Sequence, residues 1–254
     1  MAEYQFPTEI VDLPSKGYFY PETSPLSNGK VELKYMTAKE EDILTSQNLI
    51  KEGTVIDILL QSLIINKDIK VEDLLIGDKN AIMVASRILG YGKDYDFSYD
   101  GVEQKVDLTQ LEPVDIDFTD MKKGQNQFDY ELPKSERKLT FKLLTGKDEK
   151  NIDAEVKARE KLGGSSSGEL TTRLKNIITS VDGNIDRAYI NNFVDNEFLS
   201  IDSLEFRKYM GTITPDINMP VYLRTFYLKR LTTFYKKESE EMQKQMNKFK
   251  KSIK

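Results

Sequence analysis

The chain of 254 residues contains neither histidine nor cysteine, which removes most of the side chains that proteins use for chemistry. Ser-His-Asp and Cys-His nucleophilic systems cannot form within it, and the commonest general base near neutral pH is missing. Zinc sites depend on the same two residue types, so we expect neither a structural nor a catalytic zinc ion. The absence of cysteine also excludes a disulfide scaffold.

Carboxylates are the remaining candidates, and there are 42 Asp and Glu residues. Asp182, Asn184 and Asp186 have the spacing of the first three ligands of a calcium loop. The sixth position, however, holds Arg187 instead of Gly, and the twelfth holds Phe193 instead of Glu. A corner between two helices explains these residues better. Nothing selects one carboxylate pair for glycoside hydrolysis, so we predict no catalytic residue, no metal and no cofactor, and expect that the protein is not an enzyme.

Charge is unevenly spread along the chain, whose net charge is −5. Residues 220–254 hold ten Lys or Arg and three Glu, whereas the rest of the chain is strongly acidic. A body and a tail of opposite sign suggest that the tail binds a partner. Nucleic acid is a weak candidate, because the chain as a whole is acidic, the tail is rich in Lys instead of Arg, and no nucleic-acid-binding motif is present.

No segment has the pattern of a signal peptide or a membrane span. The N-terminus lacks a basic region followed by an apolar one. The longest apolar-rich stretch, residues 55–65, is interrupted by polar residues and is far shorter than the roughly 20 apolar residues that cross a bilayer. We therefore expect a cytoplasmic protein without membrane contact.

Hydrophobic periodicity and turn signals predict an α+β fold that is mainly helical, with a small antiparallel β-sheet in the middle and a long C-terminal helix. The predicted segments are an extended N-terminal segment (1–36), a helical subdomain (37–92), a small antiparallel β subdomain (93–145), a polar helix and linker (146–168), a second helical subdomain (169–219) and a long basic C-terminal helix (220–254).

Helix signals are clearest in the two helical subdomains. Thr37 and Glu40 have the spacing of a capping box that opens a helix, and Asp78 is predicted to cap a later helix that ends at a Gly-Tyr-Gly sequence. In the second subdomain, apolar residues at helical spacing over 170–181 predict one helix. Two further helices are predicted to be capped by Asp186 and by an Asp-Ser-Leu-Glu sequence that starts at position 202.

Alternating apolar and polar residues predict about five short strands in the β subdomain. Two of them flank an Asp-Gly pair that is typical of a hairpin turn. The predicted strands cover residues 95–99, 106–108, 114–118, 128–132 and 139–143. A further short strand is predicted at 29–35, in the N-terminal segment.

The predicted C-terminal helix has an apolar line that repeats every seven residues. Its Lys-rich half is expected to project from the body, and such spacing is used when a helix binds in a groove. We predict that this helix binds the partner, with self-association through it as the alternative. The predicted contact residues are Leu228, Leu231, Tyr235, Met242, Met246 and Phe249.

A second candidate surface lies where a helix start with exposed polar groups follows an apolar run. An ordinary helix cap is the alternative interpretation of the same residues. The surface comprises Asp78, Lys79, Asn80 and Arg87.

Seven longer segments are informative when they are taken together and in order. They are LPSKGYFYP, GKVELKYMTAKEEDIL, LIKEGTVIDILLQSLI, DLLIGDKNAIMVASRILGYGKDYDF, LTFKLLTGKDEK, ELTTRLKNIITSVDGNIDRAYINNFVDNEF and DSLEFRKYMGTITPDI. Between residues 13 and 217 they resemble the baseplate hub assembly family of T-even-type contractile-tailed bacteriophages.

The resemblance implies a role in phage tail morphogenesis, in which the protein assists assembly of the central baseplate hub by binding hub proteins in the host cell cytoplasm. The alternatives are a permanent structural component of the virion baseplate and a tail-associated cell-wall hydrolase. Many members of the family carry zinc-ribbon cysteine pairs. Here the first pair is replaced by the turn at 98–101 and the second by the helix after Pro220, so no metal-dependent role is carried over.

Overall fold

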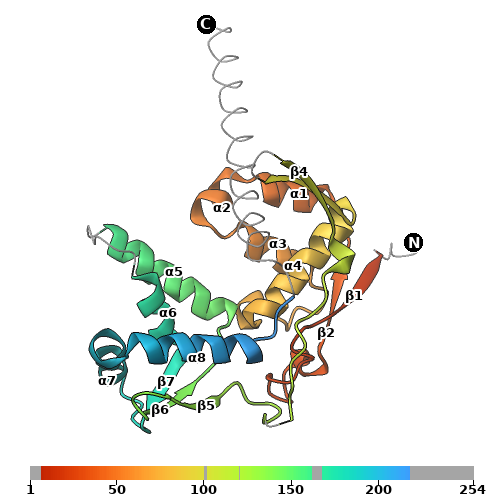
Figure 1. Cartoon of the computed structure of the whole chain (residues 1–254). Helices are drawn as coiled ribbons and strands as arrows, with labels where there is room; N and C mark the ends of the chain where they lie inside the picture. The colour runs from red at the N-terminus through yellow and green to blue at the C-terminus, as the bar shows by residue number, and fades with distance from the viewer. Residues whose placement is uncertain (1–6, 100–101, 120, 162–167, 218–254) are drawn as a thin grey trace, which may run out of the picture.

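The computed structural model describes residues 7–99, 102–119, 121–161 and 168–217, and its fold is α+β and mainly helical, as predicted (Figure 1). The predicted C-terminal helix at 220–254, with all six predicted partner-binding residues, lies outside the described residues, as does most of the predicted linker. Within the described ranges, no helix is long and apolar enough to cross a membrane.

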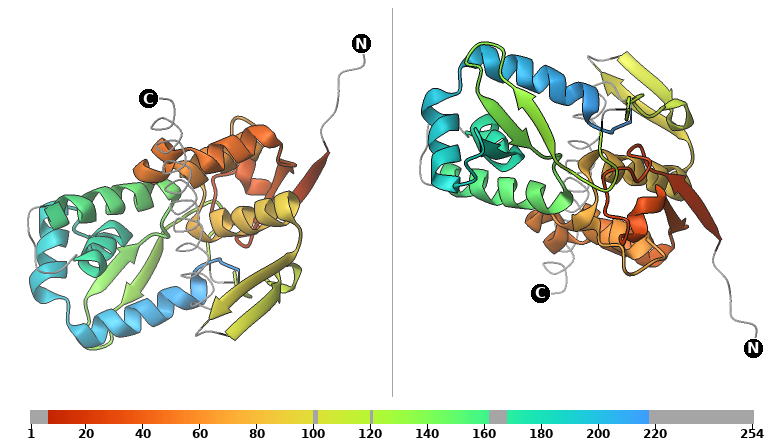
Figure 2. Two further views of the ribbon diagram at one scale, coloured as in Figure 1. Left: turned by 90° about the horizontal axis from the view of Figure 1, so that it is seen from above. Right: turned by 90° about the horizontal axis from the view of Figure 1, so that it is seen from below.

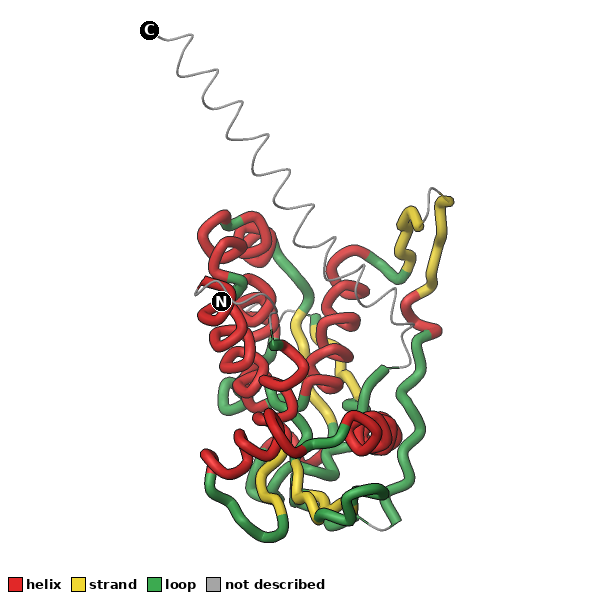
Figure 3. The backbone as a smooth tube through the Cα atoms, turned by 60° about the vertical axis from the view of Figure 1, so that its left-hand side comes forward, coloured by secondary structure: helices red, strands yellow, loops and turns green. Residues whose placement is uncertain are grey.

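The strands of the described chain form three separate antiparallel sheets instead of the single predicted one. They are β1 (Thr8–Asp12), β2 (Lys30–Lys34), β3 (Asp94–Tyr99), β4 (Val102–Asp107), β5 (Phe128–Glu131), β6 (Lys138–Phe141) and β7 (Ile178–Val181). β1 pairs with β2, β3 pairs with β4 as the predicted hairpin, and β6 lies between β5 and β7. The β3–β4 hairpin stands apart from the other strands (Figure 3).

The helices of the described chain agree with most of the predicted starts. They are α1 (Ala38–Thr45), α2 (Gln47–Glu52), α3 (Val55–Leu63), α4 (Ile76–Tyr91), α5 (Gly146–Lys161), α6 (Glu169–Ile177), α7 (Arg187–Asn192) and α8 (Ser200–Ile213). The capping box of Thr37 and Glu40 is confirmed at α1. Asp186 caps α7 as predicted, because its carboxylate accepts hydrogen bonds from the first amides of that helix.

The strand predicted at 114–118 is wrong. This segment is extended, and the amide of Val114 donates to the carbonyl of Asp216 at 2.8 Å, next to an isolated bridge between Pro113 and Ile217. No strand of the described chain runs beside it. Ile116 is buried and Phe118 packs against the main core. The alternation of apolar residues therefore arises because one face of this extended segment packs on the body, which does not require a sheet.

The helix predicted over 170–181 is also corrected. It ends at Ile177, and the next residues form β7, where Ile178 pairs with Phe141 of β6. Ile178 and Val181 are fully buried. A run of β-branched residues fits a pleated surface well, and the neighbouring strand decides between the two structures that the apolar spacing allowed.

Asp78 and Asp202 are not helix caps, contrary to prediction. Each is the third residue of its helix, α4 or α8, and the cap position is taken by a leucine, Leu75 or Leu199. Both carboxylates are fully buried. Neither caps its own helix, because both accept hydrogen bonds from turns that lie far away in the sequence.

One arrangement of elements occurs twice in the described chain. The first repeat, residues 8–91, runs from β1 to α4, and the second repeat, residues 128–213, runs from β5 to α8. The two repeats lie side by side, the first coloured red to yellow and the second green to blue (Figures 1 and 2). The β3–β4 hairpin and an extended segment connect them.

Each repeat begins with a strand followed by a Leu-Pro turn. In the first repeat the amide of Ser15, in that turn, donates to Asp78 of α4 at 2.9 Å. In the second, the amide of Lys134 donates to Asp202 of α8 at 2.8 Å. Each turn also contains a non-glycine residue with positive φ. In each repeat, therefore, the equivalent turn is hydrogen-bonded to the equivalent aspartate of the last helix.

A Lys-x-x-Thr-x-x-acid sequence follows at the end of β2 and of β6. In both copies the lysine Nζ lies 2.7 Å from the carboxylate. In both, the threonine amide donates to the same carboxylate at 3.0 Å. The residues are Lys34, Thr37 and Glu40 in the first repeat, and Lys142, Thr145 and Asp148 in the second.

The nine-residue helices α3 and α6 hold the same place in the two repeats. The residue after each helix pairs with the second strand of its repeat, Ile64 with Leu33 and Ile178 with Phe141. All four side chains are fully buried. In the first repeat this pairing is a single bridge. In the second repeat the pairing continues along β7, so its sheet has a third strand.

The two repeats share one hydrophobic core. A single cluster of buried residues includes side chains of both repeats, from Leu13 in the first to Ile213 in the second. Ile82 of α4 and Phe206 of α8, which hold matching positions, are both 0% exposed. The six-segment division proposed from the sequence stays a prediction, but this cluster joins four of the six segments, through residues such as Leu13, Leu44, Leu132 and Leu174.

Candidate functional site

The repeats meet at a short antiparallel contact between the segment that opens α4 and the segment that opens α5. The amide of Ile76 donates to the carbonyl of Leu144 at 3.1 Å, and the amide of Gly146 donates to the carbonyl of Leu74 at 2.9 Å. A Cβ atom at Gly146 would lie 2.8 Å from the carbonyl oxygen of Val71. This position therefore requires glycine for the close approach of the two backbones.

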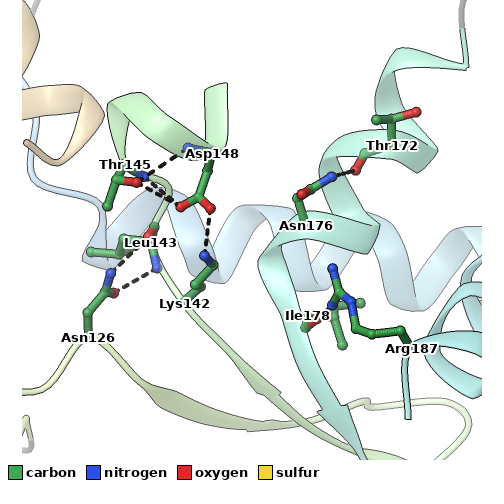
Figure 4. A network of polar contacts seen from close by, with 9 residues as sticks. All are labelled: Asn126, Lys142, Leu143, Thr145, Asp148, Thr172, Asn176, Ile178 and Arg187. Atoms are coloured by element: carbon green, nitrogen blue, oxygen red, sulfur yellow. Dashed lines mark hydrogen bonds and ion pairs between the residues drawn. The ribbon is translucent and has the colours of Figure 1, made fainter. Parts of the chain in front are cut away.

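Side chains of the second repeat and of the segment just before it hold this half of the contact in place (Figure 4). Asn126 accepts from the amide of Leu143 at 2.8 Å and donates to its carbonyl at 2.9 Å. Asp148 accepts from Thr145 and from Lys142. Burial alone would raise the pKa of Asp148, but the hydrogen bonds from Lys142 and Thr145 outweigh it and lower that pKa.

Asp78 holds the half of the contact that belongs to the first repeat. Its carboxylate accepts from the Ser15 hydroxyl and from the Tyr20 hydroxyl, both at 2.6 Å. The Tyr20 oxygen in turn accepts from the amide of Leu75 at 2.8 Å. Burial raises the pKa of Asp78, and these hydrogen bonds offset that effect only in part. Asp78 is thus an anchor inside the protein and not part of a surface, which corrects the prediction of exposed polar groups here.

A cavity of about 770 Å³ opens beside this contact, between the two repeats. The first repeat contributes residues of α2, α3 and α4 to its wall, and the second contributes residues of α5, α6 and α8. Its volume is in the range of binding pockets in proteins. The apolar side chains that line it include Ile50, Val55, Ile56, Met83, Ile177 and Met210.

Charged side chains in the cavity wall are paired with one another, and the ion pair of Asp57 with Lys150 joins the two repeats. Asp57 of α3 binds Lys79 at 2.5 Å and Lys150 of α5 at 3.2 Å. Glu149 of α5 binds Arg173 of α6 at 2.5 Å. Salt bridges of this kind orient the helices around the cavity and give it a polar margin.

One acidic residue in the cavity wall differs from these pairs. Burial raises the pKa of Asp153, and the nearby charge of Glu149 raises it further. The protonated form of Asp153 is therefore favoured relative to that of an ordinary aspartate.

The structure divides the second predicted surface into three parts. Lys79 and Asn80 line the cavity, and the Asn80 amide donates to Asp216 at 3.2 Å. Asp78 lies buried behind them. Arg87 is further along α4, where it donates to the carbonyl of Gly92 and does not line the cavity. The structure therefore brings together two of the four predicted residues.

Sequence reasoning missed the cavity residues that α5 and α6 contribute. The recurring Lys-x-x-Thr-x-x-acid sequence could have revealed them, because it marks two equivalent halves that must pack against each other. The calcium-like spacing has a different explanation, since Asp182 accepts from the amide of Lys138 and Asp186 caps α7. Among the described residues, no group of three or more acidic side chains is placed to hold a metal ion.

Comparison with known proteins gives no match to a family model, to a curated protein or to a solved structure.

Proposed function

We propose that this chain is a phage tail morphogenesis protein that assists assembly of the central baseplate hub through protein-protein binding, in the host cell cytoplasm. Support comes from the seven sequence segments that resemble the hub assembly family. The structural observation that carries the proposal is the cavity between the repeats, which has an apolar lining and a charged margin.

A segment of a hub protein fits the chemistry of this cavity better than a polar substrate does. Its apolar residues, such as Ile56 and Met210, are partly exposed and would be covered by apolar side chains of a partner. Three of the charged groups in its wall, Asp57, Lys79 and Arg173, are already engaged in ion pairs. An amphipathic helix whose apolar face enters such a groove is a common mode of recognition.

Two alternatives lead to different observations. A permanent component of the virion baseplate would be present in stoichiometric amount in purified particles, whereas an assembly factor would be absent from them or present below that amount. A tail-associated cell-wall hydrolase has one supporting feature, the raised pKa of Asp153 in the cavity wall. Release of soluble fragments from peptidoglycan by the purified protein, and its loss in Asp153→Asn, would favour the hydrolase.

Coexpression with the hub proteins of the same phage, followed by affinity capture, tests the proposal. Ile56 and Ile58 lie on the same helix, but Ile56 lines the cavity and Ile58 is 38% exposed outside it. We expect Ile56→Lys to lose the captured hub protein and Ile58→Lys to keep it. If both variants capture it equally, the cavity is not the binding site. If the unaltered full chain captures no hub protein, the proposed function itself is wrong.

The predicted terminal helix is tested separately by removing residues 228–254. Loss of the complex from a truncated chain that keeps its circular dichroism spectrum would support the helix as the partner-binding element. Unchanged capture would refute it and leave the cavity as the binding surface.

A further inference from the structure

The contact between the repeats has an unused counterpart on α8. The residue that precedes α8 has nearly the backbone conformation of the residue that precedes α4, since φ and ψ are −59° and 139° at Leu199 and −58° and 147° at Leu75. Leu75 is 3% exposed because the second repeat covers it, whereas Leu199 is 45% exposed. Ile201 and Leu204 beside it are 53% and 42% exposed. We name Phe198, Leu199, Ser200, Ile201 and Leu204 the α8 edge.

The first repeat carries the matching counterpart after β2. Residues 35–38 hold the place of residues 143–146, which receive the α4 segment in the contact between the repeats. Leu143 is 3% exposed there, but Tyr35 is 37% exposed. Ala38 is exposed, whereas its counterpart Gly146 is buried. We name Tyr35, Met36, Thr37 and Ala38 the β2 edge.

Both edges have backbone groups available for pairing. In the contact between the repeats, two amide-to-carbonyl bonds join the segments. Within the described part of the chain, the equivalent amides of Ala38 and Ser200 donate to no protein group. The equivalent carbonyls of Met36 and Phe198 likewise accept no backbone hydrogen bond there. Each edge thus presents one donor and one acceptor at the spacing that the other edge requires.

We propose that the α8 edge of one copy of this chain binds the β2 edge of a second copy, so that the contact within the chain is repeated between chains. The amide of Ser200 would donate to the carbonyl of Met36 of the second copy, and the amide of Ala38 in that copy would donate to the carbonyl of Phe198. Leu199 would be covered as Leu75 is covered. When two copies are joined in this way, each still has one unused edge, so the contact can continue head to tail into open chains or closed rings.

One difference weakens the contact between chains. Gly146 is required in the first contact because a Cβ atom there would meet a carbonyl oxygen at 2.8 Å. Ala38 carries that Cβ atom, so the second copy must lie somewhat further away. Self-association is therefore expected to depend on concentration. It is independent of hub binding, so either proposal can fail without the other.

Sedimentation velocity of the full chain over a range of concentrations tests this inference. The variants are Ala38→Pro and Ser200→Pro, each of which removes one of the pairing amides. Both positions are the first residue of a helix, where proline is tolerated. The preceding residues, Thr37 and Leu199, are extended, as the residue before proline requires. Ala38→Ser and Ser200→Ala keep both amides and serve as matched controls.

We expect the unaltered chain and both controls to gain mass with concentration, and each proline variant to raise the dissociation constant at least tenfold. An equimolar mixture of the two proline variants should form a dimer of one copy of each and nothing larger. In that mixture only the α8 edge of Ala38→Pro and the β2 edge of Ser200→Pro are intact. This rescue is specific to a head-to-tail contact.

Three results would overturn the inference. They are an unaltered chain that stays monomeric at every concentration, association that persists in both proline variants, and a mixture that stays monomeric. Association that persists would point instead to another surface, such as the predicted C-terminal helix. If a proline variant loses its circular dichroism spectrum, the exposed side chains are tested in its place with Leu199→Asp and Tyr35→Asp, which should behave in the same way.

Discussion

Both repeats contain equivalent hydrogen bonds from a turn to a buried aspartate, but these hydrogen bonds are buried to different extents in the two repeats. Asp78 accepts from three groups of one buried turn and its neighbouring tyrosine. Asp202 accepts from two amides, those of Lys134 and Ser135, in a turn that is only partly buried. The polar framework is thus the same in both copies, whereas the surrounding apolar cover differs. Equivalent residues are therefore expected to contribute unequally to stability.

The attachment of the nine-residue helices shows the same difference. In the first repeat Leu59 of α3 is 4% exposed in the core. Its counterpart in α6 is Arg173, which binds Glu149 of α5 with two hydrogen bonds. An apolar contact has been exchanged for a partly exposed ion pair at the same place. This ion pair lies in the cavity wall, so the exchange adds charge to the candidate site.

The largest difference is expected between Asp78→Ala and Asp202→Ala. Loss of Asp78 leaves the buried amide and hydroxyl of Ser15 and the hydroxyl of Tyr20 without an acceptor, and should cost about 3–5 kcal/mol. Loss of Asp202 leaves two amides without an acceptor. Because these amides lie closer to water, the loss should cost only about 1–3 kcal/mol. Urea denaturation gives both values. Equal losses would show that burial does not distinguish the repeats.

A second comparison uses the leucines before α4 and α8. Leu75→Ala removes a buried side chain and should reduce the free energy of unfolding by about 2–4 kcal/mol. Leu199→Ala removes an exposed one and should change it by less than about 0.5 kcal/mol when measured at low protein concentration, where the chain is monomeric. A large loss in Leu199→Ala under these conditions would mean that this side chain is covered within its own chain.

The pH dependence of stability should separate the two buried carboxylates of the first repeat. Burial would raise the pKa of Glu40, but hydrogen bonds from Lys34 and Thr37 outweigh it and lower the pKa to about 2. Its contribution is complete above the unfolded pKa of 4.5 and is lost as the pH falls toward about 2. The contribution of Asp78 to stability has the opposite pH dependence, because its pKa is raised in the folded protein. The fold favours its protonated form, so stability is lost as the pH rises through the folded pKa.

Glu40→Gln isolates the first of these effects. At pH 6 the variant should be less stable than the unaltered chain, by on the order of 2 kcal/mol. The difference should shrink as the pH falls below the unfolded pKa of 4.5. Urea titrations at several pH values measure it. A difference that stays constant down to pH 2 would contradict the lowered pKa of Glu40.

The smallest effect is expected for Arg173→Lys. The guanidinium group binds Glu149 through two nitrogens, which lysine cannot reproduce. Because the arginine side chain is one-third exposed, the loss should be about 0.5–1 kcal/mol and should decrease in high salt. Thermal unfolding at low and high salt checks this, with Lys208→Arg, in an exposed pair on α8, as the matched control.

The sequence predicted those features that are decided locally. The capping box at Thr37, the cap at Asp186 and the β3–β4 hairpin depend on residues that are close in the chain. The role of Asp78 could not be predicted, because its partner Ser15 lies 63 residues away. Strand β7 was missed because its neighbour β6, and not its own apolar spacing, determines its structure. The duplication was visible in the recurring Lys, Thr and acidic residues, and comparing the sequence with itself would have found it.

Hydrogen–deuterium exchange of the full chain, alone and in complex with a coexpressed hub protein, tests most directly whether the cavity between the repeats is the binding surface. We predict that the complex slows exchange in amides at both sides of the cavity, in residues 50–57 and 76–83 of the first repeat and 146–153 of the second. Slowed exchange elsewhere, with no change in these segments, would contradict this account.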